Sequence, residues 1–147
     1  MKYKNPIPVV DGIIEKNNKI LLIKRRDDPF KERLALPGGH VEYGERVEET
    51  VLREIEEETG IITEIREILG VYSDPKRDPR KHRMSTVFVL KIIDDTHAKA
   101  SSDAKSMDFY NIDELKEKDL SFDHYKIIQH YKIWKEHGGT FWSSKEI

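Results

Sequence analysis

Four glutamates are crowded onto about one turn of a helix that the sequence predicts over residues 46–59. They are Glu54, Glu56, Glu57 and Glu58. Like charges three or four residues apart on a helix each cost roughly 0.2–0.5 kcal/mol. A divalent cation would turn this repulsion into attraction, because Mg²⁺ takes carboxylate oxygens together with water and phosphate oxygens. The crowding therefore raises the hypothesis of a metal site.

The helical wheel divides these glutamates into two groups. The apolar residues at helical spacing are Val47, Val51 and Ile55. Successive residues turn by about 100°, so Glu54, Glu57 and Glu58 form an arc whose edge overlaps this apolar stripe, whereas Glu56 points away from it. A solvated acidic face is the ordinary interpretation of a charge run, and it explains Glu56. It explains Glu58 poorly, because a carboxylate among apolar neighbours is partly desolvated.

The flanking residues suggest how the carboxylates are held. Arg53 lies two turns along the helix and could pair with Glu45, just before the helix, or with Glu56. The loop at Gly38 and Gly39 brings backbone close to the start of the helix. A carbonyl oxygen of this loop is therefore a further candidate ligand.

Residues 39–61 resemble the Nudix box. Gly39, five residues, Glu45, seven residues and then Arg53-Glu54-Ile55-x-Glu57-Glu58-x-Gly60-Ile61 fit the pattern at every specified position, and "ALPGG" fits its lead-in. The resemblance implies an α/β/α sandwich with a mixed sheet between helices. It also implies hydrolysis of a nucleoside diphosphate linked to another moiety, with Mg²⁺ or Mn²⁺ as cofactor.

The resemblance carries roles to individual residues. The implied metal ligands are Glu54, Glu57, Glu58 and the carbonyl oxygen of Gly38. Arg53 and Glu45 would orient them. The general base stays open between Glu54, Glu57 and Asp103, which lies in the polar segment "SSDAK" and is alternatively a turn former.

A second segment, 74–83, is basic where the box is acidic. It has five basic against two acidic residues, whereas segment 39–61 has eight glutamates against two arginines. Guanidinium groups facing a metal site would suit a diphosphate, although a solvated loop is the alternative. The expected substrate-binding residues are Lys76, Arg77, Arg80, Arg26 and Tyr72. His82 is a further candidate for a phosphate contact.

The same segment is similar to that of ADP-ribose pyrophosphatases within the family, since Pro75 follows Gly60 by fifteen residues. The implied reaction gives AMP and ribose 5-phosphate. Glu32 and Leu34 stand where this subgroup usually has glycine and tryptophan. The candidate walls for an adenine ring are Tyr3, Phe30 and Tyr72, each of which could instead be packing. Phe141 and Trp142 would cover the core or form the interface of a homodimer, which is common in the subgroup.

Composition excludes several classes of function. The net charge of −2 gives no general attraction to nucleic acid or anionic membranes, and the absence of cysteine excludes disulfides and thiolate ligands. No apolar run reaches the ~20 residues of a membrane span, and the N-terminus lacks the apolar run of a signal peptide. We expect a cytoplasmic protein with a small nucleotide as substrate and no nucleic-acid or membrane partner.

The elements that must position these residues alternate between strands and helices. Strands are predicted at 8–15, 19–25, 61–73, 83–93 and 105–112, with an Asn-rich turn joining the first two. A second helix ends at Gly138, with Ser121 or Asp123 as its cap. This order predicts an α/β fold in one domain spanning residues 1–147.

Three other functions compete with ADP-ribose hydrolysis. Hydrolysis of nucleoside triphosphates or of dinucleoside polyphosphates would use the same box. An ADP-ribose sensor would bind without cleaving, but such regulators attach a winged helix after the domain, for which 147 residues leave no room, and tend to lose box carboxylates. Every box carboxylate is present here, which favours an enzyme.

Overall fold

The structure, a computed structural model, describes residues 3–100 and 104–147. The strands are β1 (Ile7–Lys16), β2 (Lys19–Arg25), β3 (Leu34–Ala35), β4 (Gly38–His40), β5 (Ile62–Tyr72), β6 (Arg83–Asp94), β7 (Ala104–Asn111) and β8 (Phe141–Trp142). The helices are α1 (Val47–Thr59), α2 (His124–His137) and a short 3₁₀ turn, η1 (Glu117–Asp119). Within the described residues, no helix is long and apolar enough to cross a membrane.

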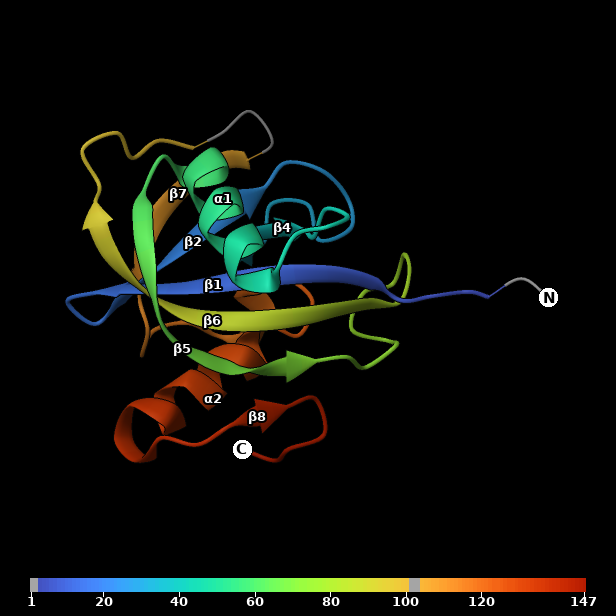
Figure 1. The fold of residues 1–147 in the computed structure, drawn as a ribbon. Coiled ribbons are helices and arrows are strands. Elements are labelled where there is room, and N and C mark those ends of the chain that lie inside the picture. Colours follow the sequence, from blue (N-terminus) through green and yellow to red (C-terminus); the bar gives the residue numbers. More distant parts are fainter. Residues whose placement is uncertain (1–2, 101–103) are drawn as a thin grey trace.

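The strands form a mixed sheet with a helix on each side (Figure 1). Their order is β3-β2-β1-β6-β5-β8, while β4 pairs with β1 and β7 with β2. β1 runs parallel to β6 and β5 parallel to β8, and the other pairs are antiparallel. The predicted α/β sandwich with a mixed sheet between helices is confirmed.

The two central strands serve both helices because successive side chains of a strand point to opposite faces. The cluster beneath α1 contains Val10, Ile14, Phe88 and Leu90 with Val51 and Ile55 of the helix. The cluster beneath α2 contains Ile13, Val87 and Val89 with Ile127, Ile128 and Tyr131 of that helix. β1 and β6 are therefore buried on both faces, and α1 is fixed over the centre of the sheet.

The predicted hairpin is present, and its turn explains its asparagines. Asn17 and Asn18 have φ of 53° and 61°, which the short asparagine side chain tolerates better than most. The strands predicted at 61–73, 83–93 and 105–112 also exist, with ends shifted by about one residue, as expected for frayed ends.

Three short strands and one helix cap differ from the prediction. β3, β4 and β8 have two or three residues each, so their pairing depends on neighbours distant in sequence. Asp123 does occupy the N-cap position of α2, but its carboxylate makes no capping bond and binds the Arg77 side chain instead. Phe141 is buried in the core, as one reading of the C-terminus expected.

Gly60 ends α1 in a conformation and a space that suit only glycine. Its φ is 73°, and its N–H donates to the carbonyl oxygen of Glu56 at 2.8 Å. A β carbon at Gly60 would lie 2.1 Å from the carbonyl oxygen of His97. The end of the acidic helix is thereby packed against the backbone that follows β6.

Replacing Gly60 by alanine should destabilise the fold more than its φ alone explains. Gly44→Ala is the matched control, because Gly44 has φ of +88° but nothing within 4 Å of its added β carbon. The control should cost roughly 1–2 kcal/mol of unfolding free energy, and Gly60→Ala clearly more. Urea unfolding of both variants measures the difference, and equal losses would contradict the packing against His97.

Candidate functional site

One guanidinium group organises the acidic helix. Arg53 donates from Nε and Nη2 to the two carboxylate oxygens of Glu45, at 2.8 and 2.9 Å. Its Nη1 donates to Glu54 at 2.9 Å and to Glu57 at 3.1 Å, and its Nη2 reaches the carbonyl oxygen of His40 at 3.3 Å. The expected pairing of Arg53 with Glu45 is present, and the same side chain also orients two of the predicted metal ligands.

Glu45 is the most fully bonded of these carboxylates. Besides Arg53, it accepts hydrogen bonds from the backbone N–H of Glu42 and the hydroxyl of Thr50, each at 2.9 Å. The hydrogen bonds from Arg53 and then from Glu42 lower the pKa of Glu45 to about 2. Glu45 in turn raises the pKa of Arg53 above its usual value. Both members of this pair are therefore charged at neutral pH.

The glycine loop fits closely under the helix. β4 pairs with β1, placing Gly38 opposite Asp11 and Gly39 opposite Val10. A β carbon at Gly39 would lie 2.1 Å from the carboxyl carbon of Glu54. Burial in this contact raises the pKa of Glu54, while Arg53 opposes the shift.

The carboxylates and the basic segment meet at one cavity of about 620 Å³, the carboxylate cavity. Its predicted metal ligands are Gly38, Glu54, Glu57 and Glu58. Its arginines are Arg25, Arg77, Arg80 and Arg83. Seven carboxylates line the cavity against these four arginines, so a diphosphate would be repelled unless further positive charge were bound there.

The donor set fits a hard divalent cation. Three carboxylates of α1 line the cavity together with Gly38 and Gly39 of the glycine loop, and oxygen ligands suit Mg²⁺ and Mn²⁺. Glu54 is largely buried, with 20% of its side chain exposed, whereas Glu57 is 60% exposed. In the described residues no three acidic, histidine or cysteine side chains are gathered closely enough to hold a metal ion, and Glu54 and Glu57 are both bonded to Arg53.

The three arginines of the basic segment pair with two aspartates, because Arg80 and Arg83 share Asp78. Arg77 binds Asp123 through two bonds of 3.0 and 2.8 Å, and only 4% of its side chain is exposed. Arg80 binds Asp78 in the same bidentate way, at 3.0 and 2.8 Å, but 43% of its side chain is exposed. Arg80 is thus the better placed of the two to meet a substrate phosphate from solvent.

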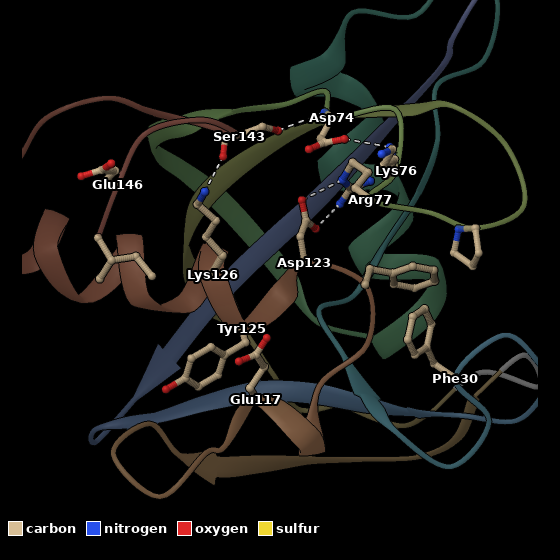
Figure 2. A pocket seen from close by; sticks show the side chains of 13 residues that line it. Phe30, Asp74, Lys76, Arg77, Glu117, Asp123, Tyr125, Lys126, Ser143 and Glu146 are labelled. Carbon is tan, nitrogen blue, oxygen red and sulfur yellow. Dashed lines mark hydrogen bonds and ion pairs between the residues drawn. The ribbon is translucent and has the colours of Figure 1, made fainter.

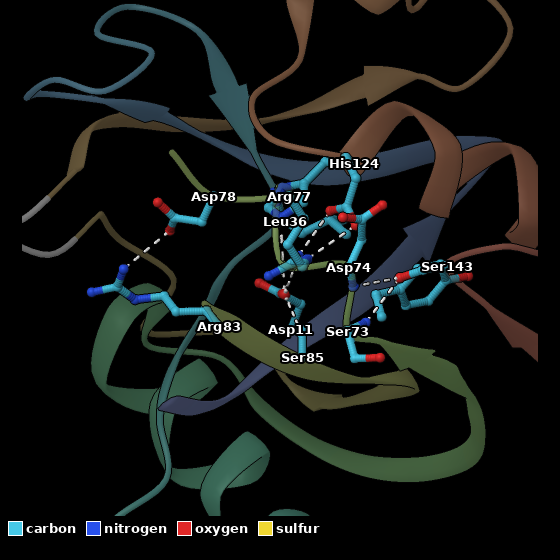
Figure 3. A network of polar contacts seen from close by, with 12 residues as sticks. Asp11, Leu36, Ser73, Asp74, Arg77, Asp78, Arg83, Ser85, His124 and Ser143 are labelled. Atoms are coloured by element: carbon cyan, nitrogen blue, oxygen red, sulfur yellow. Dashed lines mark hydrogen bonds and ion pairs between the residues drawn. The ribbon is translucent and has the colours of Figure 1, made fainter. Parts of the chain in front are cut away.

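A buried polar network supports the inner wall of the cavity (Figure 3). Asp11 accepts a hydrogen bond from the hydroxyl of Ser85 and lies 3.9 Å from the guanidinium of Arg77. Burial raises the pKa of Asp11 to about 7. His124 accepts a hydrogen bond from the N–H of Leu36 at 2.9 Å, and burial lowers the pKa of its imidazole to about 3. β1, β6, α2 and the basic segment are joined here.

Several predicted residues lie outside the carboxylate cavity. Tyr72 is wrong as a substrate contact, because it is fully buried and its hydroxyl bonds to His130 at 2.7 Å. Arg26 is exposed and does not line the cavity, whereas its neighbour Arg25 does. Lys76 lines an adjoining cavity. Asp103 lies outside the described residues.

Two further candidates also lie elsewhere. His82 bonds through Nε2 to the carbonyl oxygen of Ser73 at 2.9 Å and does not line the cavity. Tyr3 is 82% exposed and lines neither this cavity nor the adjoining one.

Sequence reasoning missed the polar residues on the inner wall. Asp11 interrupts an apolar strand, "PVVDGII", and a carboxylate inside such a run is a signal that could have been noticed. Arg83 lies in the basic segment 74–83 but was not among the predicted substrate contacts. His124 gave no comparable signal, because its surroundings come from strands and loops far away in sequence. Phe122 was likewise hidden in the segment before α2.

The sequence and the fold are both matched by known proteins. A family profile described as "NUDIX domain" matches residues 6–131. The chain belongs to the NUDIX domain family. Another member, the ADP-ribose pyrophosphatase of Methanocaldococcus jannaschii, is 56% identical over 133 residues, covering 90% of this chain and 77% of that protein. Against several other curated NUDIX relatives the chain spans about half of their length.

Solved structures of NUDIX proteins have the same fold. A NUDIX hydrolase from Nitrosomonas europaea superposes with a TM-score of 0.79 at 27% identity, over 96% of this chain and 78% of that one. A bifunctional NMN adenylyltransferase/ADP ribose pyrophosphatase from Francisella tularensis, complexed with AMP and a Mn ion, gives 0.73 at 27% identity. That match covers 95% of this chain and 44% of the longer protein.

The Glu45–Arg53 pair should make the free energy of unfolding depend on pH. Because the pKa of Glu45 is about 2 in the folded state and 4.5 is its ordinary value, its stabilisation is complete above pH 4.5 and lost as the pH falls toward 2. Urea unfolding of the wild type and Glu45→Gln should therefore differ most near pH 6 and converge near pH 2. Glu48→Gln, an exposed glutamate of the same helix, is the control, and a pH-independent difference for Glu45→Gln would refute the pairing.

Proposed function

We propose that this chain hydrolyses ADP-ribose to AMP and ribose 5-phosphate with Mg²⁺ or Mn²⁺ bound to the box carboxylates. The observation that carries the proposal is the single cavity in which three glutamates of α1 face four arginines. The 56% identity to an ADP-ribose pyrophosphatase supports the choice of substrate. The Mn ion and AMP bound to the Francisella protein support the metal and one product.

The residues of the chain divide the work of phosphoryl transfer. Bound divalent metal would polarise the phosphate oxygens and lower the pKa of the attacking water. Glu54, Glu57, Glu58 and the Gly38 carbonyl would hold it, and Arg53 with Glu45 would keep the first two glutamates oriented. Arg80 would neutralise charge that develops on the phosphates. Water adds to one phosphorus, the bridging P–O bond breaks, and Glu54, Glu57 or Asp103 accepts the proton of the water.

A homodimer, a cytoplasmic location and one domain over residues 1–147 remain predictions from the sequence. Trp142 is 48% exposed and lies opposite Val71, which is 40% exposed, so apolar surface at β8 supports the proposed contact between two chains. Light scattering in solution measures the pairing directly.

Replacing one metal ligand should separate catalysis from folding. Glu57→Gln should lower kcat by at least about a hundredfold, and calorimetry should show weakened Mn²⁺ uptake, with the unfolding curve little changed because Glu57 is exposed. Glu56→Gln is the matched control: Glu56 neighbours Glu57 on the same helix, is exposed and does not line the cavity. A fully active Glu57→Gln variant would overturn the ligand assignment.

The substrate is tested by direct competition among nucleotides. With Mg²⁺ present, kcat/KM should be highest for ADP-ribose in a panel that includes deoxynucleoside triphosphates, dinucleoside polyphosphates and other ADP-sugars, with AMP or phosphate release as the readout. A deoxynucleoside triphosphate ranking well above ADP-ribose would sink the substrate assignment while leaving the pyrophosphohydrolase intact. Tight binding of ADP-ribose without turnover would instead indicate a sensor.

A further inference from the structure

A second cavity of about 720 Å³ adjoins the carboxylate cavity (Figure 2). Arg77 and Phe122 line both cavities, so they form a shared wall. Phe30 and Tyr125 add further aromatic surface to the second one. We call it the aromatic cavity. A ligand whose diphosphate lies among the box glutamates could therefore extend past Phe122 into it.

Three arginines contact the two phenylalanine rings that line the aromatic cavity. The rings of Phe30 and Phe122 meet edge to face, with centroids 4.9 Å apart. Arg25 and Arg80 lie over the Phe122 ring at 4.9 and 5.6 Å from its centroid, and Arg33 lies over Phe30 at 5.5 Å. Arg25 and Arg80 also line the carboxylate cavity, so the same two arginines contact Phe122 and the expected position of the diphosphate.

Both phenylalanines are held in a backbone conformation that disfavours them. Phe30 has φ of 60° and Phe122 of 54°, in the left-handed region that normally takes glycine or asparagine. The two asparagines at positive φ, in the β1–β2 turn, show the usual choice of residue. Residues persist in such positions only where the surrounding structure holds them there, and these positions cluster at active sites and ligand-binding sites. Here the two residues at positive φ bring their rings into edge-to-face contact at the cavity.

The charges of the aromatic cavity favour a neutral group over a phosphate. Three cations line it against four carboxylates. Two of these cations are engaged, since Arg77 binds Asp123 and the Lys126 ammonium bonds to the carbonyl oxygen of Ser143. Carboxylates such as Glu117 and Asp74 repel phosphate but accept hydrogen bonds from sugar hydroxyls. A planar base with its ribose matches this lining.

We propose that the aromatic cavity binds the adenosine half of the substrate, with the adenine ring against Phe30 and Phe122. The proposal rests on ADP-ribose as substrate, and it assigns specificity to residues outside the box. The box glutamates and arginines act on the diphosphate that all substrates of this class share. The two phenylalanines distinguish what is attached to it.

The test uses glycine variants, because glycine suits the φ of both positions and removes only the ring. Calorimetric titration of Phe30→Gly and Phe122→Gly with AMP, in the presence of Mg²⁺, should show about tenfold weaker binding than the wild type, as for loss of one stacking side chain. Affinity for ribose 5-phosphate should stay unchanged. Tyr3→Gly, which removes an exposed aromatic ring that lines neither cavity, should change neither affinity.

The outcomes separate this proposal from the proposed function. Unchanged AMP affinity in both phenylalanine variants, or an equal loss in Tyr3→Gly, overturns the adenosine site even if ADP-ribose is hydrolysed. Weaker binding of ribose 5-phosphate alone also overturns it, because the other end of the substrate would then occupy the cavity. If the wild type does not cleave ADP-ribose but the variants show the expected AMP affinities, the adenosine site is supported and the proposed reaction is rejected. Thermal unfolding verifies that each variant is folded. If Phe122→Gly does not fold, Phe122→Leu takes its place, because it removes the ring but keeps an apolar side chain. It should show the same loss of AMP affinity, and an unchanged AMP affinity overturns the adenosine site.

Discussion

The structure depends on one guanidinium group that binds three carboxylates at once. Arg53 contacts Glu45, Glu54 and Glu57, and the helix tolerates its crowded glutamates because this positive charge lies among them. A surface ion pair is ordinarily worth little, but bidentate contacts on a partly buried network fix geometry. The ligands that a metal requires are thereby arranged by the protein itself, at the price of a site that remains strongly negative overall.

The opposite wall of the cavity is built from arginines that are paired with aspartates. Arg77 and Arg80 each bind an aspartate, so they bring directed N–H groups to the cavity without adding much net charge. Arg77 also joins the basic segment to the start of α2 through Asp123 and lies beside the buried Asp11 of β1. The segment that the sequence showed only as a basic loop is, in the folded protein, part of the wall between two cavities.

The sequence predicted the layers and the box because both depend on local patterns. Helical spacing identified α1, alternation and turn residues identified the long strands, and Gly60 marked the end of the helix. It could not predict β3, β4 or β8, whose pairing comes from distant neighbours. The sequence also predicted Tyr72 as a substrate contact, although its side chain is buried in the core. The sequence pattern of an aromatic residue at a strand end is the same whether the side chain faces a pocket or the core. Asp123 looked like a cap, and only the fold reveals Arg77 as its partner.

The two loop glycines, although adjacent, answer to different constraints. A side chain at Gly38 would collide with the backbone oxygen of Val10 at 2.0 Å, whereas one at Gly39 would collide with the Glu54 side chain. The collision at position 38 involves the backbone of the sheet, so it remains whichever side chains the active site carries. The collision at position 39 involves only the Glu54 side chain, so it disappears if Glu54 is replaced by a shorter residue. In descendants of this chain that have lost catalysis, position 38 should remain glycine, whereas position 39 should accept other residues. The residue at position 39 is therefore the better indicator of whether a descendant is still active.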